Sequence, residues 1–264
     1  MRFRPYHLLL AAALTAGAAL AQNPVQAATP VHRMAADAHP SFAVATIKPH
    51  DPNSRRQGWN VRGDRFIIEN QTVTSMMMYA YSIDPHQVAG VPGWADNAAY
   101  DVEGITDTPG EANLRQQQEM IQKLLADRFQ LKFHREKREL PVYAVRVAKG
   151  GPKLTPAANP GREHGQRASG QGTETTVFFT SASIADFILD MQFFLDRPLV
   201  DQTGLTGRYD ITLRYTHDEA HTTDPNAPPG LFTAVQEQLG LKLDAVKVPI
   251  DVYVIDHVEK PSAN

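Results

Sequence analysis

The pair His217 and His221 is the feature of the sequence whose spacing most resembles a metal site. Two histidines four residues apart on one helix face can share a zinc ion, with a glutamate between them as base. Such a motif needs the glutamate at position 218, or at 220 in its inverted form, whereas this sequence has Glu219. The pair also lies in a polar, proline-containing stretch, residues 217–229, which disfavours a helix. The sequence therefore predicts no metal site.

Other catalytic motifs are equally incomplete. Ser169 lies in a polar stretch with no preceding strand and outside any Gly-x-Ser-x-Gly turn. No glycine-rich phosphate loop follows a strand, so no cofactor is expected. Asp101 and Asp210 occupy equivalent places in a repeat of the chain, and paired carboxylates can act as acid and base. They can equally hold turns or pair with a nearby arginine, and we assign no catalytic residue.

Two glycine-containing loops carry the candidate binding residues. Residues 91–94 (VPGW) and 204–208 (GLTGR) each precede a predicted strand, and loops on a rigid sheet are where binding residues gather. The candidate ligand-binding residues are Trp94, Tyr100, Asp101, Arg208, Tyr209 and Asp210. Trp94 offers a flat apolar face and Arg208 a planar fork for an anion. The alternative is structural: Trp94 anchors the core, and Arg208 braces a turn through Asp201 or Asp210.

The first 21 residues read as a secretory signal peptide. Arg2 and Arg4 precede an uncharged apolar run of about 13 residues, shorter than the roughly 20 that span a bilayer. Small residues before position 22 predict cleavage after Ala21, with a second cleavage position after Ala27. No later segment is long and apolar enough to span a membrane. We therefore expect an exported protein, periplasmic or extracellular, with no transmembrane segment after signal cleavage.

The amino-acid composition limits the classes of binding partner that we expect. The 264 residues carry a net charge of −3 at pH 7, which becomes more negative once Arg2 and Arg4 are removed. Nucleic-acid binding needs a basic surface, so we expect no nucleic-acid partner. The sequence contains no cysteine, which excludes disulfides, thiolate metal sites and cysteine nucleophiles. The remaining partners are a small molecule, a glycan or an envelope protein.

The chain repeats its own pattern at a spacing of about 110 residues. The matching pairs are FIIENQTV (66–73) with VFFTSASI (177–184), AYDV (99–102) with RYDI (208–211), LK (131–132) with LK (241–242), and VY (142–143) with VY (252–253). The pattern predicts an α+β fold of two duplicated units, each with antiparallel strands and two helices, packed into one compact body. The predicted boundaries are a signal peptide (1–21), a flexible lead-in (22–40), a first unit (41–155), a linker or long loop (156–176) and a second unit (177–264).

Local signals place several elements. We expect a first strand at 42–47, a helix capped at Thr108, and central strands at 140–147 and 250–255. Residues 134–139 alternate in charge, which predicts a solvated hairpin tip. Ser183 with Asp186 predicts a capping box, and Gly240 a left-handed helix end.

Six ordered segments resemble the signatures of a known family. They are FAVATIKP (42–49), VPGW (91–94), LLADRF (124–129), KGGPKL (149–154), VDQTGLTGRYD (200–210) and IDHVEKP (255–261). Together they are similar to the soil-associated family of exported bacterial proteins, a domain of unknown function expanded in acidobacteria. The resemblance implies no agreed activity and no catalytic residues. Some relatives are attached to membrane metallopeptidases, which by analogy suits a binding ectodomain.

The sequence therefore favours an exported protein of unknown biochemical function that acts as a non-catalytic binding or interaction module of the cell envelope or extracellular space. The alternative is an envelope hydrolase with an unrecognised acid/base site, and a third reading is a structural envelope component.

Overall fold

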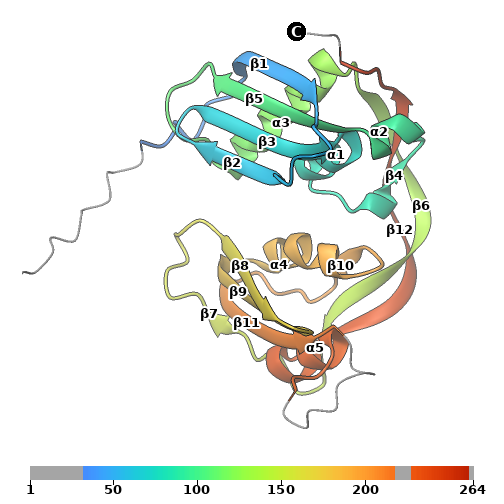
Figure 1. Ribbon diagram of the computed structural model, residues 1–264. Coiled ribbons are helices and arrows are strands. Elements are labelled where there is room, and N and C mark those ends of the chain that lie inside the picture. Colours follow the sequence, from blue (N-terminus) through green and yellow to red (C-terminus); the bar gives the residue numbers. More distant parts are fainter. Residues whose placement is uncertain (1–31, 218–226, 262–264) are drawn as a thin grey trace, which may run out of the picture. The chain divides into compact units, whose positions relative to one another are not determined.

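The computed structural model describes residues 32–217 and 227–261. The predicted signal peptide and His221 lie outside the described residues. Helices and mainly antiparallel strands alternate along the chain, which confirms the α+β class (Figure 1). Within the described part, no helix is both long and apolar enough to cross a bilayer.

The first sheet is antiparallel and has the strand order β1-β5-β3-β2. Its strands are β1 (Phe42–Pro49), β2 (Gly58–Arg62), β3 (Arg65–Thr72) and β5 (Ala99–Thr106). β1 confirms the strand predicted at 42–47. Apolar residues alternate along β3 and β5, so one face of this sheet is buried.

Three helices belong to the first half of the described chain, one more than the two expected in each unit, because a five-residue helix begins after Pro92. They are α1 (Val73–Tyr81), α2 (Gly93–Asn97) and α3 (Leu114–Arg128). The prediction that Thr108 caps the helix of this region is wrong: α3 begins later, where Asn113 and Gln116 form a reciprocal capping box. The hydroxyl of Thr108 donates instead to Asp107, 2.8 Å away. The expected capping box of Thr108 with Glu111 does not form, because the backbone of Glu111 pairs with residues 32–34 instead of entering a helix.

The second outer sheet is also antiparallel, with the order β7-β11-β9-β8. Its strands are β7 (Thr155–Pro156), β8 (Gly165–Gln171), β9 (Glu174–Ala182) and β11 (Tyr209–Thr216). β8 lies inside the stretch expected as a linker or long loop. Its backbone pairs with β9 from Gly165 to Gln171, so a segment rich in glycine and glutamine still forms a regular edge strand.

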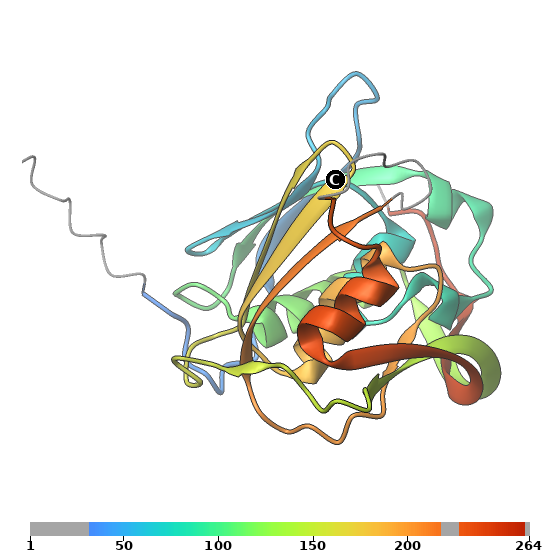
Figure 2. The same cartoon turned by 90° about the horizontal axis from the view of Figure 1, so that it is seen from below.

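Two helices and a 3-10 turn complete the second half. α4 (Ile184–Met191) starts at Ser183, whose capping box with Asp186 confirms the prediction, and continues into η2 (Gln192–Phe194). α5 (Leu231–Leu239) ends at Gly240 with φ 64°, which confirms the predicted left-handed end. Figure 2 shows α5 beside the neighbouring strands, where it contacts β11 and β12.

A long two-stranded ribbon forms the centre of the third sheet. β6 (Lys132–Val147) pairs antiparallel with β12 (Leu241–His257), and the short strands β10 (Leu199–Asp201) and β4 (Val88–Ala89) flank them in parallel. The predicted central positions of 140–147 and 250–255 are confirmed. The hairpin tip predicted at 134–139 is wrong, because these residues lie within β6.

The charged part of β6 pairs with β12 along its backbone, and the partner strand carries complementary charges. Lys137 Nζ lies 2.9 Å from Asp251 Oδ1, and His134 Nδ1 lies 2.8 Å from Asp256 Oδ1. Both pairs are largely exposed, so solvent reaches the ribbon here. Opposite charges across an antiparallel pair stabilise it modestly and keep it soluble.

Two large hydrophobic clusters share the ribbon. The first gathers α1, α3 and the first sheet, and includes Leu131 just before β6 together with Tyr253 and Ile255 of β12. The second gathers α4, α5 and the second outer sheet, and includes Val145 of β6 and Leu241 of β12. Each cluster therefore uses one end of both long strands.

Candidate functional site

Trp94 and Tyr100 belong to the first hydrophobic cluster. Trp94 lies in α2, is half-buried, and has Lys260 Nζ 5.9 Å from its ring centroid. Tyr100 is 5% exposed and meets Phe129 edge to face at 5.4 Å. Burial raises the pKa of Tyr100. Tyr100 therefore serves the core, while Trp94 keeps one partly open face.

Asp101 stabilises an irregular point in strand β3, where the pairing with β5 shifts register. Its Oδ1 accepts the backbone N–H of Asn70 at 3.1 Å and lies 2.6 Å from His50 Nδ1. Asn70 has φ 56° at the point where the pairing of β3 with β5 shifts register. A shift of this kind leaves a backbone donor unpaired, and the carboxylate satisfies it. The same carboxylate raises the pKa of His50 through their hydrogen bond.

Asp210 does the same for β9. Its Oδ1 accepts the N–H of Ser181 at 2.8 Å, and its Oδ2 accepts the N–H of Ala158 at 3.0 Å. Ser181 has φ 51°, again beside a shift in strand register. The N–H donors of Ala158 and then Ser181 lower the pKa of Asp210. Each aspartate therefore accepts a backbone N–H group at an irregular point of a strand, one in each outer sheet.

Arg208 and Tyr209 pack beside this turn. Arg208 Nε donates to Ser181 Oγ at 3.1 Å, and its terminal nitrogen lies 3.3 Å from Asp186 Oδ2. Its partner is thus Asp186 rather than the Asp201 or Asp210 considered from sequence. Tyr209 is half-buried against the second hydrophobic cluster.

The six candidate residues from the sequence divide between the two halves of the described chain. Trp94, Tyr100 and Asp101 have their contacts in the first half, and Arg208, Tyr209 and Asp210 in the second. None of them lines the pocket at the start of α5. The described contacts do not join Trp94 to Arg208.

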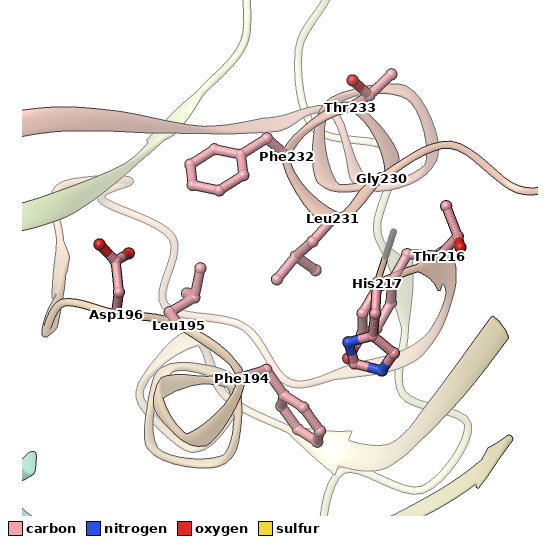
Figure 3. A pocket seen from close by; sticks show the side chains of 10 residues that line it. Phe194, Leu195, Asp196, Thr216, His217, Gly230, Leu231, Phe232 and Thr233 are labelled. Carbon is pink, nitrogen blue, oxygen red and sulfur yellow. The ribbon is translucent and has the colours of Figure 1, made fainter. Parts of the chain in front are cut away.

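That pocket has a volume of about 580 Å³. Three segments far apart in sequence line it: Phe194, Leu195 and Asp196 after α4; Tyr215, Thr216 and His217 at the end of β11; and Gly230, Leu231, Phe232 and Thr233 at the start of α5. Leu195 and Leu231 point toward one another across its middle, and Asp196 and His217 lie on opposite sides (Figure 3). The volume falls within the range of small-molecule sites.

Aromatic rings form much of the wall. Phe232 is 43% exposed, and its ring meets Tyr143 edge to face at 5.0 Å. Tyr215 is almost fully buried, 5.0 Å from His217 and 6.3 Å from Phe194 between ring centroids. Exposed aromatic surface beside a hollow is costly in water unless a ligand covers it.

A carboxylate lies at one side of the pocket. Asp196 Oδ1 accepts the hydroxyl of Tyr143 at 2.9 Å, and Arg197 Nε lies 3.5 Å from Asp196 Oδ2. The Tyr143 hydrogen bond lowers the pKa of Asp196, so the group is ionised at neutral pH. Its side chain is still 70% exposed and open to a further partner.

A separate polar network lies at the start of β8. His164 Nε2 lies 2.9 Å from Asp190 Oδ2, and His164 Nδ1 lies 4.0 Å from Asp186 Oδ1. Asp186 also serves the capping box of Ser183 and the ion pair with Arg208. The hydrogen bond to Asp190 raises the pKa of His164. His164 Nε2 and Asp190 Oδ2 are buried, and the ion pair between them is the polar contact that the described residues give these two atoms. It ties the start of β8 to α4.

One pocket residue was detectable from sequence. In α5, Leu231, Ala234, Val235 and Leu239 share the buried face, so helical periodicity leaves Phe232 outside it. The segment before α5 also supplies Gly230 where a capping side chain is usual. Nothing in the sequence links these residues to Asp196 or Tyr215, which only the fold brings near.

In residues 32–217 and 227–261, no group of three His, Cys, Asp or Glu side chains is arranged to hold a metal ion. Comparison with curated proteins and with solved structures found no match. A family model described as "Protein of unknown function (DUF3738)" matches residues 74–258, which is most of the chain and includes the second outer sheet and the central ribbon. The match begins after β3, so β5 is the strand of the first sheet that it contains. The chain therefore belongs to the DUF3738 family of proteins of unknown function.

Proposed function

We propose that this protein is an exported binding module whose ligand site is the pocket at the start of α5. The observation that carries the proposal is the pocket itself: about 580 Å³, bordered by the exposed ring of Phe232 and by an ionised Asp196. Apolar walls with a few polar groups are the usual make-up of a ligand site. The roles of Asp101 and Asp210 in holding backbone donors favour binding over acid/base catalysis by that pair.

A ligand screen tests this role. Purified protein is screened by thermal shift against glycans, peptidoglycan fragments, amino acids and peptides, because a ligand of the folded state must raise Tm. We expect Phe232→Ala to abolish the shift produced by any hit. Leu114→Ala in α3 is the matched control, since Leu114 is also 43% exposed and lies outside the pocket. A hit that both variants bind equally well would refute the assigned pocket.

Export is the second part of the proposal, and the N-terminal sequence supports it. The basic residues Arg2 and Arg4, the apolar run and the small residues before position 22 fit a cleaved signal peptide of a protein destined for the periplasm or beyond. The same proposal places the chain in the exported, soil-associated family expanded in acidobacteria. Mass spectrometry of protein from fractionated native cells should find a terminus near Gln22, whereas an intact Met1 in the membrane fraction would refute export.

We also propose that the two halves arose by duplication, with units at 41–155 and 177–264. Numbered from the first strand of each, both outer sheets have the same strand order, and the second sheet takes β7 and β8 from the residues just before the second unit. Support also comes from the two aspartates, since Asp101 and Asp210 each hold the N–H of a left-handed residue, Asn70 or Ser181. An experimental structure tests this: residues 66–147 and 177–257 should superpose strand for strand, and a different element order in either half would refute it.

A further inference from the structure

The exposed face of α5 borders two further hollows besides the pocket at its start. Phe232 and Thr233 line that pocket and also a hollow of about 230 Å³ beside the start of β12. One helical turn further on, Gln236 and Glu237 line this second hollow and a third one of about 400 Å³ at the end of α5. Because neighbouring hollows share these walls, they form one groove along the helix, which we call the α5 groove.

The end of the α5 groove at the C-terminus of the helix is positively charged. Lys149, Lys153 and Lys242 line the hollow there, against the carboxylate of Glu237. Lys153 Nζ donates to the backbone carbonyl of Glu237 at 2.8 Å, so this lysine offsets the partial negative charge of the helix end. Lys149 is exposed, and within residues 32–217 and 227–261 its ammonium group has no ion-pair partner. Lys149 is therefore available to an anion in the groove.

Lys242 is a second cation at this end that is only partly neutralised. Its Nζ lies 2.7 Å from Asp244 Oδ2, and a terminal nitrogen of Arg146 lies 3.0 Å from the same oxygen. One carboxylate thus faces two cations, and the side chain of Lys242 is still 40% exposed. Ammonium groups gathered around one hollow attract an anion. This end of the α5 groove therefore suits a carboxylate.

The other end of the α5 groove has the opposite charge. Asp196 lines the pocket at the start of α5 with its side chain 70% exposed, and Arg197 approaches only one of its oxygens, at 3.5 Å. Beside Asp196 lie Leu195 and Leu231, which point toward one another (Figure 3), and the exposed ring of Phe232. The groove therefore runs from a carboxylate, across apolar side chains, to a set of ammonium groups.

We propose that the α5 groove binds a short, extended peptide with a basic group at one end, an apolar side chain in the middle and an acidic group at the other end. The basic group pairs with Asp196, the apolar side chain packs on Phe232, and the acidic group joins Lys149 and Lys242. This inference rests on the proposed function and names the ligand class of the pocket and its continuation along α5.

Length and charge favour a peptide over other ligands. The nine residues of α5 rise about 1.5 Å each, so the groove is about 13 Å long, which about five residues of extended chain span. A single amino acid is too short to reach both ends. A neutral or acidic glycan offers no cation to Asp196. A peptide carries both charges and an apolar side chain on one chain, and charge-assisted contacts are the stronger kind.

The test is a titration of the full protein with three pentapeptides whose ends are acetylated and amidated, so that only side chains carry charge. They are Lys-Ala-Phe-Ala-Glu, Lys-Ala-Phe-Ala-Lys and Glu-Ala-Phe-Ala-Glu. Calorimetry gives Kd, and backbone amide NMR shifts locate the peptide. We expect the first peptide to bind about tenfold or more tightly than either of the others, with shifts at Gly150, Phe232 and Gln236.

Two variants separate the two ends of the peptide. Lys149→Gln should weaken Lys-Ala-Phe-Ala-Glu severalfold and leave Lys-Ala-Phe-Ala-Lys unchanged. Asp196→Asn should weaken Lys-Ala-Phe-Ala-Glu and leave Glu-Ala-Phe-Ala-Glu unchanged. The matched controls are Lys247→Gln in β12 and Asp96→Asn in α2, which remove exposed charges outside the groove and should leave all three affinities unchanged.

The outcomes distinguish this inference from the proposed function. Equal affinity for the three peptides, or shifts at Phe232 without shifts at Gly150, would overturn the inference and leave the pocket as a binding site. Absence of peptide binding, together with a glycan or another hit of the ligand screen that Phe232→Ala abolishes, would overturn it in the same way. Peptide binding that neither Phe232→Ala nor Lys149→Gln affects would overturn both.

Discussion

Replacing His164 by glutamine should destabilise the protein by an amount that depends on pH. His164 is 16% exposed at its side chain and pairs with Asp190 at 2.9 Å, with Asp186 4.0 Å away. The hydrogen bond to Asp190 raises the pKa of His164 above its usual 6.5, while burial and the charge of Arg208 oppose that shift. The favoured state is therefore the protonated one.

The direction of this pH dependence follows from the raised pKa of His164. Below about pH 6.5 the histidine is protonated in both the folded and the unfolded chain, so the folded state gains the whole ion pair. As the pH rises through the higher pKa of the folded state, the proton leaves and this part of the stability is lost. An exposed ion pair contributes about 0–1 kcal/mol, and a pair that is largely screened from water contributes more. The loss in His164→Gln should thus fall by about 1 kcal/mol between about pH 5.5 and about pH 9.

Urea denaturation of wild type and His164→Gln at the two pH values measures this difference. In thermal melts it corresponds to about 2–4 °C in Tm for a chain of this size. His134→Gln is the control, because His134 pairs with Asp256 at 2.8 Å but is 53% exposed. Exposed ion pairs contribute little to stability, so His134→Gln should change the free energy of unfolding by no more than about 0.5 kcal/mol at either pH. An equal loss for His164→Gln at both pH values would refute a charge-assisted bond to Asp190.

Two further predictions use matched pairs of variants and the same urea assay. Tyr79→Phe should lower the free energy of unfolding by about 1 kcal/mol, because the Tyr79 hydroxyl donates to Gln117 at 2.6 Å. Tyr215→Phe should be neutral or stabilising, because the Tyr215 hydroxyl has no described partner, and equal losses in the two variants would contradict this. Gly240→Ala should lower the free energy of unfolding by about 2 kcal/mol or more, since Gly240 has φ 64° and a methyl group would overlap the backbone of Gly151. Gly204→Ala should lower it by about 1 kcal/mol, because Gly204 has φ 70° but open space around it. Similar losses would show that the backbone shifts to accommodate the methyl group at Gly240.

Local signals predicted the elements whose cause is local. The capping box of Ser183 and the left-handed end at Gly240 depend on a few neighbouring residues, and both are present. The predicted start of α3 was wrong. Thr108, Pro109 and Glu111 have the pattern of a capping box, but the backbone of Glu111 pairs with residues 32–34, and the helix begins at the capping box of Asn113 and Gln116.

The central ribbon and the pocket could not be predicted in this way. A charged run such as residues 134–139 normally indicates a loop, and it forms a strand here because β12 pairs with it along its whole length. The pocket depends on three segments that end side by side only after α5 has packed against β11. One lining residue, Tyr215, occupies a buried position in the alternating pattern of β11, as a core residue does. It differs from a core residue in its hydroxyl, which has no hydrogen-bond partner among the described residues.

The shared ribbon sets the order in which the chain can fold. The first hydrophobic cluster needs Tyr253 and Ile255, which are synthesised long after its other buried members, all of which lie between Ile47 and Leu131. A nascent chain that has reached Val147 holds α1, α3 and the first sheet but lacks the strand that closes their core. Such contacts between distant residues form late and slowly. The N-terminal half must therefore remain incomplete until β12 is available, so a chain stopped before β12 should expose the apolar side chains that β12 covers.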